Sequence, residues 1–121
     1  MHIILDITTN HIGNGNPWYL DAKDNPNAST ADFFDYDPET GKIDTWLGVP
    51  LLIKLNYKSQ LLRDRMYRDK DAALRYWLNE PYRIDGWRLD VANMTGNLRE
   101  NQLDHEVWRE MRPYIKNEHS E

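Results

Sequence analysis

The chain has 121 residues, enough for one ordinary domain, and 40% of them are apolar. It contains no cysteine, which excludes disulfide bonds and thiolate metal sites. Its formal net charge is −5, with acidic and basic residues interspersed, so nucleic acid is not an expected partner. Residues 1–5 lack a basic leader, and no apolar run reaches the length of a membrane span. We therefore expect no membrane partner and a cytoplasmic location.

The first predicted element is a short buried strand, because residues 2–8 are mostly apolar and β-branched. A polar segment that contains Asn10 and His11 follows it. Residues 14–56 are rich in Asn, Asp, Pro and Gly, which predicts a small, loop-rich domain inserted after the strand. Within this excursion, residues 37–41 (Asp-Pro-Glu-Thr-Gly) are typical of a turn with a small hairpin around it.

Helical spacing of apolar residues returns over residues 59–80, with Ser59 as the expected cap. The polar run at 69–71 predicts an interruption, after which one of its two aspartates caps a second helical run. Trp77 falls on the apolar face of that run and is expected in the core. Pro81 predicts the end of the helix.

Residues 84–92 predict a second strand that carries an Arg–Asp pair. Alternate residues of a strand share a face, so Arg88 and Asp90 project side by side while Trp87 and Leu89 pack on the other face. A guanidinium beside a carboxylate favours its charged form, and an ionised Asp at a strand end suits a covalent nucleophile in sugar chemistry. A structural ion pair at the rim of a sheet is the competing interpretation.

A last helix is expected after residues 95–103, with Asp104 as its cap and Pro113 kinking or shortening it. The order strand, excursion, helix, strand, helix predicts an α/β fold in which a right-handed crossover makes the two strands parallel. In such sheets the residues that carry chemistry lie beyond the carboxyl ends of the strands. Two polar clusters fall there: Asn10 with His11, and residues 90–93. We therefore expect the two clusters to converge in space.

Three motifs carry a resemblance to a known family. Residues 6–11 (Asp-Ile-Thr-Thr-Asn-His) match D-x-x-x-N-H, and residues 86–92 match G-[FW]-R-[LV]-D-x-A. Between them, residues 45–48 (Thr-Trp-Leu-Gly) and 54–57 (Lys-Leu-Asn-Tyr) look like W-x-G followed by L-P-x-L-N. Each motif alone has little specificity, but their common order favours one family. The chain resembles the α-amylase superfamily of glycoside hydrolases, nearest to maltodextrin glucosidases, cyclomaltodextrinases and neopullulanases.

The resemblance implies a fragment of a TIM (β/α)8 barrel. It would span the third strand, the inserted small domain, the third helix, the fourth strand and the fourth helix. A complete barrel needs about 250 residues, so further barrel segments are an expected partner. Because two strands alone leave unpaired edges, we expect these 121 residues by themselves to be marginally stable or to aggregate.

The resemblance also implies roles for named residues. Asp90 is expected to be the nucleophile of a retaining hydrolase that acts on α-glucans or maltooligosaccharides, with Arg88 orienting it. His11, Trp46 and Asn93 are expected to bind the substrate, although packing is an equal alternative for Trp46. The general acid of the family is a Glu on the fifth strand, outside this chain, so the chain alone is expected to be inactive.

Two further residues are expected to be architectural. Asp6 is expected to be buried and to tether neighbouring loops, and Asn10 occupies a position that binds calcium in many relatives. The resemblance requires no cofactor but allows calcium at Asn10, for which no other oxygen ligand is evident in the sequence.

Two other functions remain open. A fragment of an α-glucan glycosyltransferase would share the fold, because a sugar can replace water in resolving the covalent intermediate. A non-catalytic carbohydrate-binding fragment could be built from the aromatic residues. A phosphate- or nucleotide-binding domain is not favoured, because the sequence has no Gly-rich loop between a strand and a helix.

Overall fold

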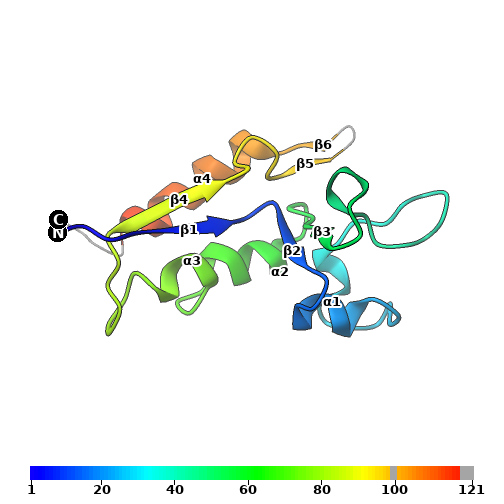
Figure 1. Ribbon diagram of the computed structural model, residues 1–121, viewed down its shortest axis with the longest axis horizontal. Helices are drawn as coiled ribbons and strands as arrows, with labels where there is room; N and C mark the ends of the chain where they lie inside the picture. The colour runs from blue at the N-terminus through cyan, green and yellow to red at the C-terminus, as the bar shows by residue number, and fades with distance from the viewer. Residues whose placement is uncertain (99–100, 118–121) are drawn as a thin grey trace.

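The structure is a computed structural model, and it describes residues 1–98 and 101–117. Short strands are interspersed with helices and helical turns along the chain (Figure 1). The elements in chain order are β1 (Ile4–Thr8), β2 (His11–Gly13), α1 (Pro17–Ala22), the 3-10 turns η1 (Ala31–Phe33) and η2 (Trp46–Gly48), β3 (Leu52–Lys54), α2 (Gln60–Arg63), the π-helical turn η3 (Asp64–Arg68), α3 (Ala73–Tyr76), β4 (Gly86–Asp90), β5 (Asn97–Leu98), β6 (Asn101–Gln102) and α4 (Asp104–Lys116).

β1 and β4 pair in parallel and lie side by side in Figure 1, as the crossover rule predicts. Asp6 lies opposite Arg88, and Thr8 lies opposite Asp90. The carboxyl ends of the two strands therefore meet at one edge. Leu89, between the two charged residues of β4, packs against the core, which confirms the predicted alternation of faces.

β4 ends earlier than its sequence predicts. The apolar, β-branched pattern extends to residue 92, but Val91 has a φ of 53° and cannot continue a strand. The chain turns there and, through residues 91–96, reaches β5, which pairs antiparallel with β6. Asp90 thus stands at the last position of the strand, immediately before a sharp change of direction.

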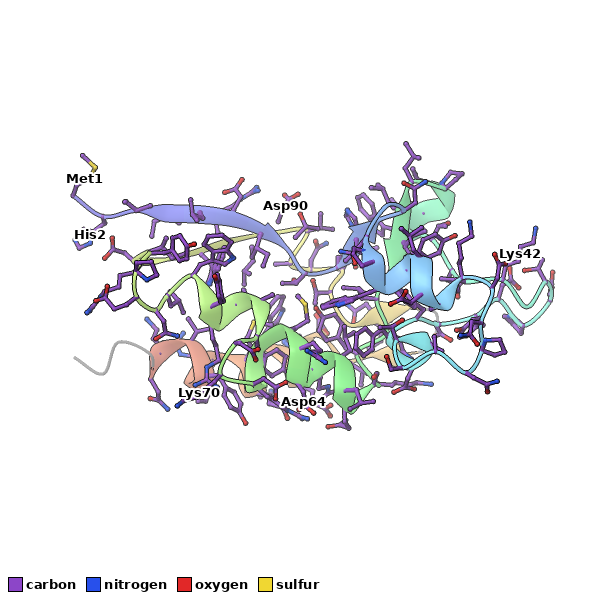
Figure 2. The ribbon with its side chains drawn as sticks, turned by 90° about the horizontal axis from the view of Figure 1, so that it is seen from below. Met1, His2, Lys42, Asp64, Lys70 and Asp90 are labelled. Carbon is purple, nitrogen blue, oxygen red and sulfur yellow. The ribbon has the colours of Figure 1, made fainter. Side chains whose placement is uncertain are left out.

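The helical segments α2, η3, α3 and α4 cover one face of the β1–β4 pair (Figure 2). Their apolar residues form one core, in which Leu62, Leu74, Val107 and Met111 are fully buried. Trp87 is partly buried and packs against this core. Asp6, Arg88 and Asp90 belong to the opposite face, as the alternation along each strand requires.

The interruption predicted at residues 69–71 is confirmed, but the predicted cap is wrong. The residue before α3 is Ala72, which has no side-chain acceptor. Its backbone N–H donates instead to the carbonyl of Asp69, at 3.0 Å, so a backbone turn takes the place of an aspartate cap.

The expectation that Trp77 is a core residue is also wrong. Trp77 is 39% exposed and lies against the rings of Tyr76 and Tyr82, with centroid distances of 5.2 and 4.7 Å. Leu78, the next residue, is 1% exposed, so the chain at this point buries the leucine and leaves the indole with the two tyrosines.

Two details of α4 correct the sequence expectations. Asp104 is the first residue of the helix rather than its cap, and the preceding Leu103 is held by a backbone hydrogen bond to the carbonyl of Gly96 at 3.0 Å. Pro113 does not shorten the helix, which continues to Lys116. None of the helices in the described residues is long and apolar enough to cross a membrane.

The excursion over residues 14–56 returns to the strands through β3, which pairs antiparallel with β2. The turn predicted at residues 37–41 is present, with a bridge between Tyr36 and Ile43 that closes the short hairpin around it. Phe33 and Phe34 of the excursion are buried in the same core as the helices. The division of the chain into an inserted domain at 14–56 stays a prediction.

Candidate active site

Three charged side chains stand on the uncovered face of β1 and β4. Nη1 of Arg88 lies 2.9 Å from Oδ1 of Asp90, to which it donates, and 3.5 Å from Oδ2 of Asp6. Figure 2 shows Asp90 at the end of the strands that faces the 14–56 excursion. The predicted Arg–Asp pair is therefore present, and both partners are accessible, with side chains 58% and 45% exposed.

Asp6 is not the buried tether that the sequence analysis expects. Its side chain is 75% exposed, and it contacts Arg88 across the parallel pair. The register explains this, because Asp6 lies opposite Arg88 and must share its face. A role in orienting Arg88 stays a prediction.

The end of β1 is held by buried polar contacts. Thr9 and Asn10 are completely buried. The hydroxyl of Tyr57 donates to the Thr9 carbonyl at 2.6 Å, and the hydroxyl of Thr9 lies 2.8 Å from that of Thr95, beyond β4. These contacts fasten the two strand ends together and set the place from which the next residue, His11, projects.

His11 starts β2 and is only partly buried. Its ring stacks on Trp46 with a centroid distance of 4.9 Å and an angle of 10°. Burial and the nearby positive charge of Lys54 lower the pKa of His11, while the carboxylate of Asp90 acts in the opposite direction. His11 and Asp90, which are 79 positions apart in the sequence, therefore act on one another at one site, as the sequence predicts.

Lys54 also belongs to this site, although no sequence motif identified it as a site residue. It is 2% exposed, and its Nζ donates to Oδ1 of Asn10 and, at 2.8 Å, to the carbonyl of Met94. Burial lowers the pKa of Lys54 to about 8. One feature of the sequence indicates its burial: Lys54 interrupts the apolar run 51–55, and a buried lysine there requires hydrogen-bond partners.

Asn93 and Trp46, the two remaining residues expected to bind substrate, lie in different surroundings. Asn93 is exposed in the turn after β4, and its carbonyl accepts a hydrogen bond from Asn97 at 2.9 Å. Trp46 comes from η2, where Leu47 has a φ of 52° and Gly48 a φ of 76°. This constrained turn carries the indole against His11, so Trp46 lies at the site, and the binding of sugar by either residue stays a prediction.

The residues around Asn10 do not fit a calcium ion. Calcium takes six to eight oxygen ligands, whereas the side-chain oxygen of Asn10 already accepts a hydrogen bond from the Lys54 ammonium. A second cation there would be repelled by that charge. Within residues 1–98 and 101–117, no three His, Asp or Glu side chains gather as a metal site.

Comparisons with known proteins agree with the motifs. The model of the family "Alpha amylase, catalytic domain" matches residues 1–121. A cyclomaltodextrinase from Bacillus sp. is 30% identical over 124 residues, covering 96% of this chain and 20% of that protein. An intracellular maltogenic amylase from Bacillus subtilis (strain 168) is 32% identical over 122 residues, covering 98% of this chain and 18% of that protein.

Solved structures give the same result. The type III pullulan hydrolase from Thermococcus kodakarensis superposes with a TM-score of 0.77 at 28% identity, covering 99% of this chain and 20% of that one. The chain thus spans about a fifth of the length of these relatives. Its family model, its relatives and its fold place the chain in the alpha-amylase catalytic-domain family, as its motifs predict.

Proposed function

We propose that the chain is part of the catalytic barrel of a retaining glycoside hydrolase that acts on α-glucans or maltooligosaccharides. In this proposal β1 and β4 are the third and fourth strands of the barrel, and α4 is the fourth helix. The names of the relatives, a cyclomaltodextrinase and a maltogenic amylase, support this substrate class. The name of the second, which is called intracellular, supports a cytoplasmic location.

The observation that carries the proposal is the place of Asp90 at the end of β4, accessible and bound by Arg88 at 2.9 Å. A carboxylate oxygen of Asp90 would attack the anomeric carbon, forming a carbon–oxygen bond as the bond to the leaving oxygen breaks. Arg88 would hold the carboxylate in the attacking orientation. His11 and Trp46 would contact the sugar ring from β2 and η2, with Asn93 on the leaving-group side.

The proposed reaction needs a second carboxyl group, about 5–5.5 Å from the first, to protonate the leaving oxygen. Asp6 is a poor candidate, because it shares the Arg88 guanidinium with Asp90. We assign to these 121 residues the nucleophile without the general acid. Hydrolysis of ordinary glucans would then depend on further barrel segments.

A glycosyl fluoride separates the nucleophile from the general acid, because fluoride departs without being protonated. The protein made from the complete reading frame would be treated with a 5-fluoro-α-glucosyl fluoride. The carbon–fluorine bond at the anomeric centre breaks, an ester to Asp90 forms, and fluoride leaves. Mass spectrometry of the proteolysed protein should find one added glycosyl group on the peptide that contains residue 90.

The matched variants are Asp90→Asn, which should lose the label, and Asp71→Asn, which changes an exposed aspartate between η3 and α3 and should keep it. Label that remains in Asp90→Asn, or that lies on another carboxylate, would show that Asp90 is not the nucleophile. A separate incubation with maltotriose would distinguish hydrolysis from transfer. Products longer than maltotriose would assign the protein to transfer.

A further inference from the structure

A buried chain of hydrogen bonds runs from the turn after β4 to the imidazole of His11. Lys54, from β3, donates to the carbonyl of Met94 and to Oδ1 of Asn10. The other side-chain atom of Asn10, Nδ2, lies 3.1 Å from Nδ1 of His11. Lys54 and Asn10 are 2% and 0% exposed, so solvent does not compete for these contacts.

The direction of each hydrogen bond follows from the chemistry of Lys54. An ammonium group has donors and no acceptor, so the Asn10 atom that faces it must be the carboxamide oxygen. The amide nitrogen of Asn10, which can only donate, is thereby turned toward His11. Nδ1 of His11 must then be the acceptor, and in a neutral imidazole the proton stands on the other nitrogen, Nε2.

Two other features favour a neutral and fixed ring. The stack on Trp46, at 4.9 Å and 10°, limits rotation of the imidazole out of this geometry. Burial and the charge of Lys54 lower the pKa of His11, which favours the uncharged form, although Asp90 opposes this.

We propose that Lys54 is a positioning residue that, through Asn10, holds His11 as the tautomer with its proton on Nε2. Lys54 also donates to the carbonyl of Met94 in the turn after β4. The same hydrogen bonds therefore connect the His11 side chain to the strand end that carries Asp90. Under the proposed function, on which this part of the inference rests, the Nε2–H group is a ready donor to a sugar hydroxyl.

The tautomer can be read directly from the imidazole nitrogens by NMR of protein labelled with ¹⁵N-histidine. The sequence has four histidines, and His11→Asn identifies the signals of His11 by their loss. In the wild-type protein, made from its complete reading frame, we expect Nε2 to carry the proton and Nδ1 to show the shift of an acceptor.

Asn10→Asp tests the chain of hydrogen bonds from Lys54 through Asn10 to His11, while it keeps an acceptor for Lys54. A carboxylate cannot donate to Nδ1, so the proton should move to Nδ1, or His11 should become doubly protonated. Lys54→Met removes the ammonium and leaves the Asn10 amide free to turn, so the Nε2–H form should lose its dominance. Lys58→Met, an identical change at an exposed lysine four residues away, should leave the spectrum of His11 unchanged.

A wild-type spectrum with the proton on Nδ1, or an unchanged tautomer in Asn10→Asp, would overturn the inference. Near-ultraviolet circular dichroism of each variant verifies folding, and Asn10→Asp keeps the test decisive if Lys54→Met does not fold. The measurement needs no substrate, so failure of the tautomer inference and failure of the glycosidase proposal are distinguishable. Loss of labelling at Asp90 would count against the function and leave the tautomer as measured.

Discussion

At the scale of single residues, the site is organised by two cations that differ in their surroundings. Arg88 is accessible and joins two carboxylates across the strand pair. Lys54 is buried and joins two neutral acceptors, the Asn10 side chain and the Met94 carbonyl. The guanidinium suits the first task because its planar array of donors fits carboxylates, and the compact ammonium suits the second.

Replacing Arg88 by Lys should lower kcat by on the order of 100-fold in the protein made from the complete reading frame. A single ammonium cannot reproduce the contacts of Nη1 with Asp90 and Asp6. Initial rates on maltotriose would measure the effect. Arg83→Lys is the matched control, since Arg83 pairs with Glu80 on the surface and should retain full activity.

Lys54 should make stability depend on pH in alkaline solution. Its pKa falls from 10.5 to about 8 on folding, so above about pH 8 the unfolded chain binds more protons than the folded one. Between about pH 8 and 9.5 the free energy of unfolding should therefore rise by on the order of 1 to 2 kcal/mol. Nearer pH 10 the raised pKa values of the buried Tyr57 and Tyr67 begin to oppose this rise. Urea denaturation across this range would measure it. Lys54→Met should lack this rise. The same dependence of the free energy of unfolding on pH in both proteins would contradict the expectation.

At the scale of elements, the turn between β4 and α4 carries the sharpest constraints. Val91 and Gly96 both have a positive φ, of 53° and 82°. The carbonyl of Gly96 accepts a hydrogen bond from Leu103, and the hydroxyls of Thr95 and Thr9 are 2.8 Å apart. This turn therefore connects the end of β4 to the first turn of α4 and to β1.

Gly96→Ala should destabilise the protein by about 3 kcal/mol. A Cβ there would lie 3.0 Å from the carbonyl carbon of Leu103 and 3.1 Å from the nitrogen of Asp104, and φ is already positive. Gly41→Ala separates the two causes, because Gly41 has a φ of 72° with open space around it and should cost about 1 kcal/mol. Urea denaturation of both variants measures the difference, and equal losses would show that the close approach to Leu103 is unimportant.

At the scale of the whole molecule, the strands are covered on one face by α2, α3 and α4 (Figure 2). Ile3, Ile4 and Leu5 remain 48%, 56% and 39% exposed. A cleft of about 910 Å³ lies between β4 and α4, lined in part by Ile4, Trp87 and Met111. Exposed apolar surface of this kind beside strand edges favours association with other chains or segments.

The 121 residues expressed alone should self-associate, as sedimentation velocity would show by a loss of monomer with rising concentration. Ile4→Lys should reduce association, because it places a charge on the exposed strand. Leu20→Lys is the control: Leu20 is 53% exposed but lies on α1, away from the β1–β4 pair. A single monomeric species with one sharp thermal transition would contradict this prediction.

Much of the site follows from local patterns. Alternation along residues 84–92 placed Arg88 and Asp90 on one face, and the strand–helix–strand order brought His11 to the same edge. The missed features depend on contacts between distant segments. The exposure of Asp6 follows from its register with Arg88, and the role of Lys54 follows from its contact with Asn10, 44 positions away.

The family, the parallel pairing and the identity of the charged pair can all be predicted from the amino-acid sequence, because motifs and periodicities are local in the chain. The tertiary structure alone decided the surroundings of Asn10. Asn10, the residue expected to allow a metal, instead meets a buried ammonium from a strand 44 positions away. Which group fills a buried polar position depends on the packing of the whole chain, since an unpaired polar atom is costly and any nearby segment can satisfy it.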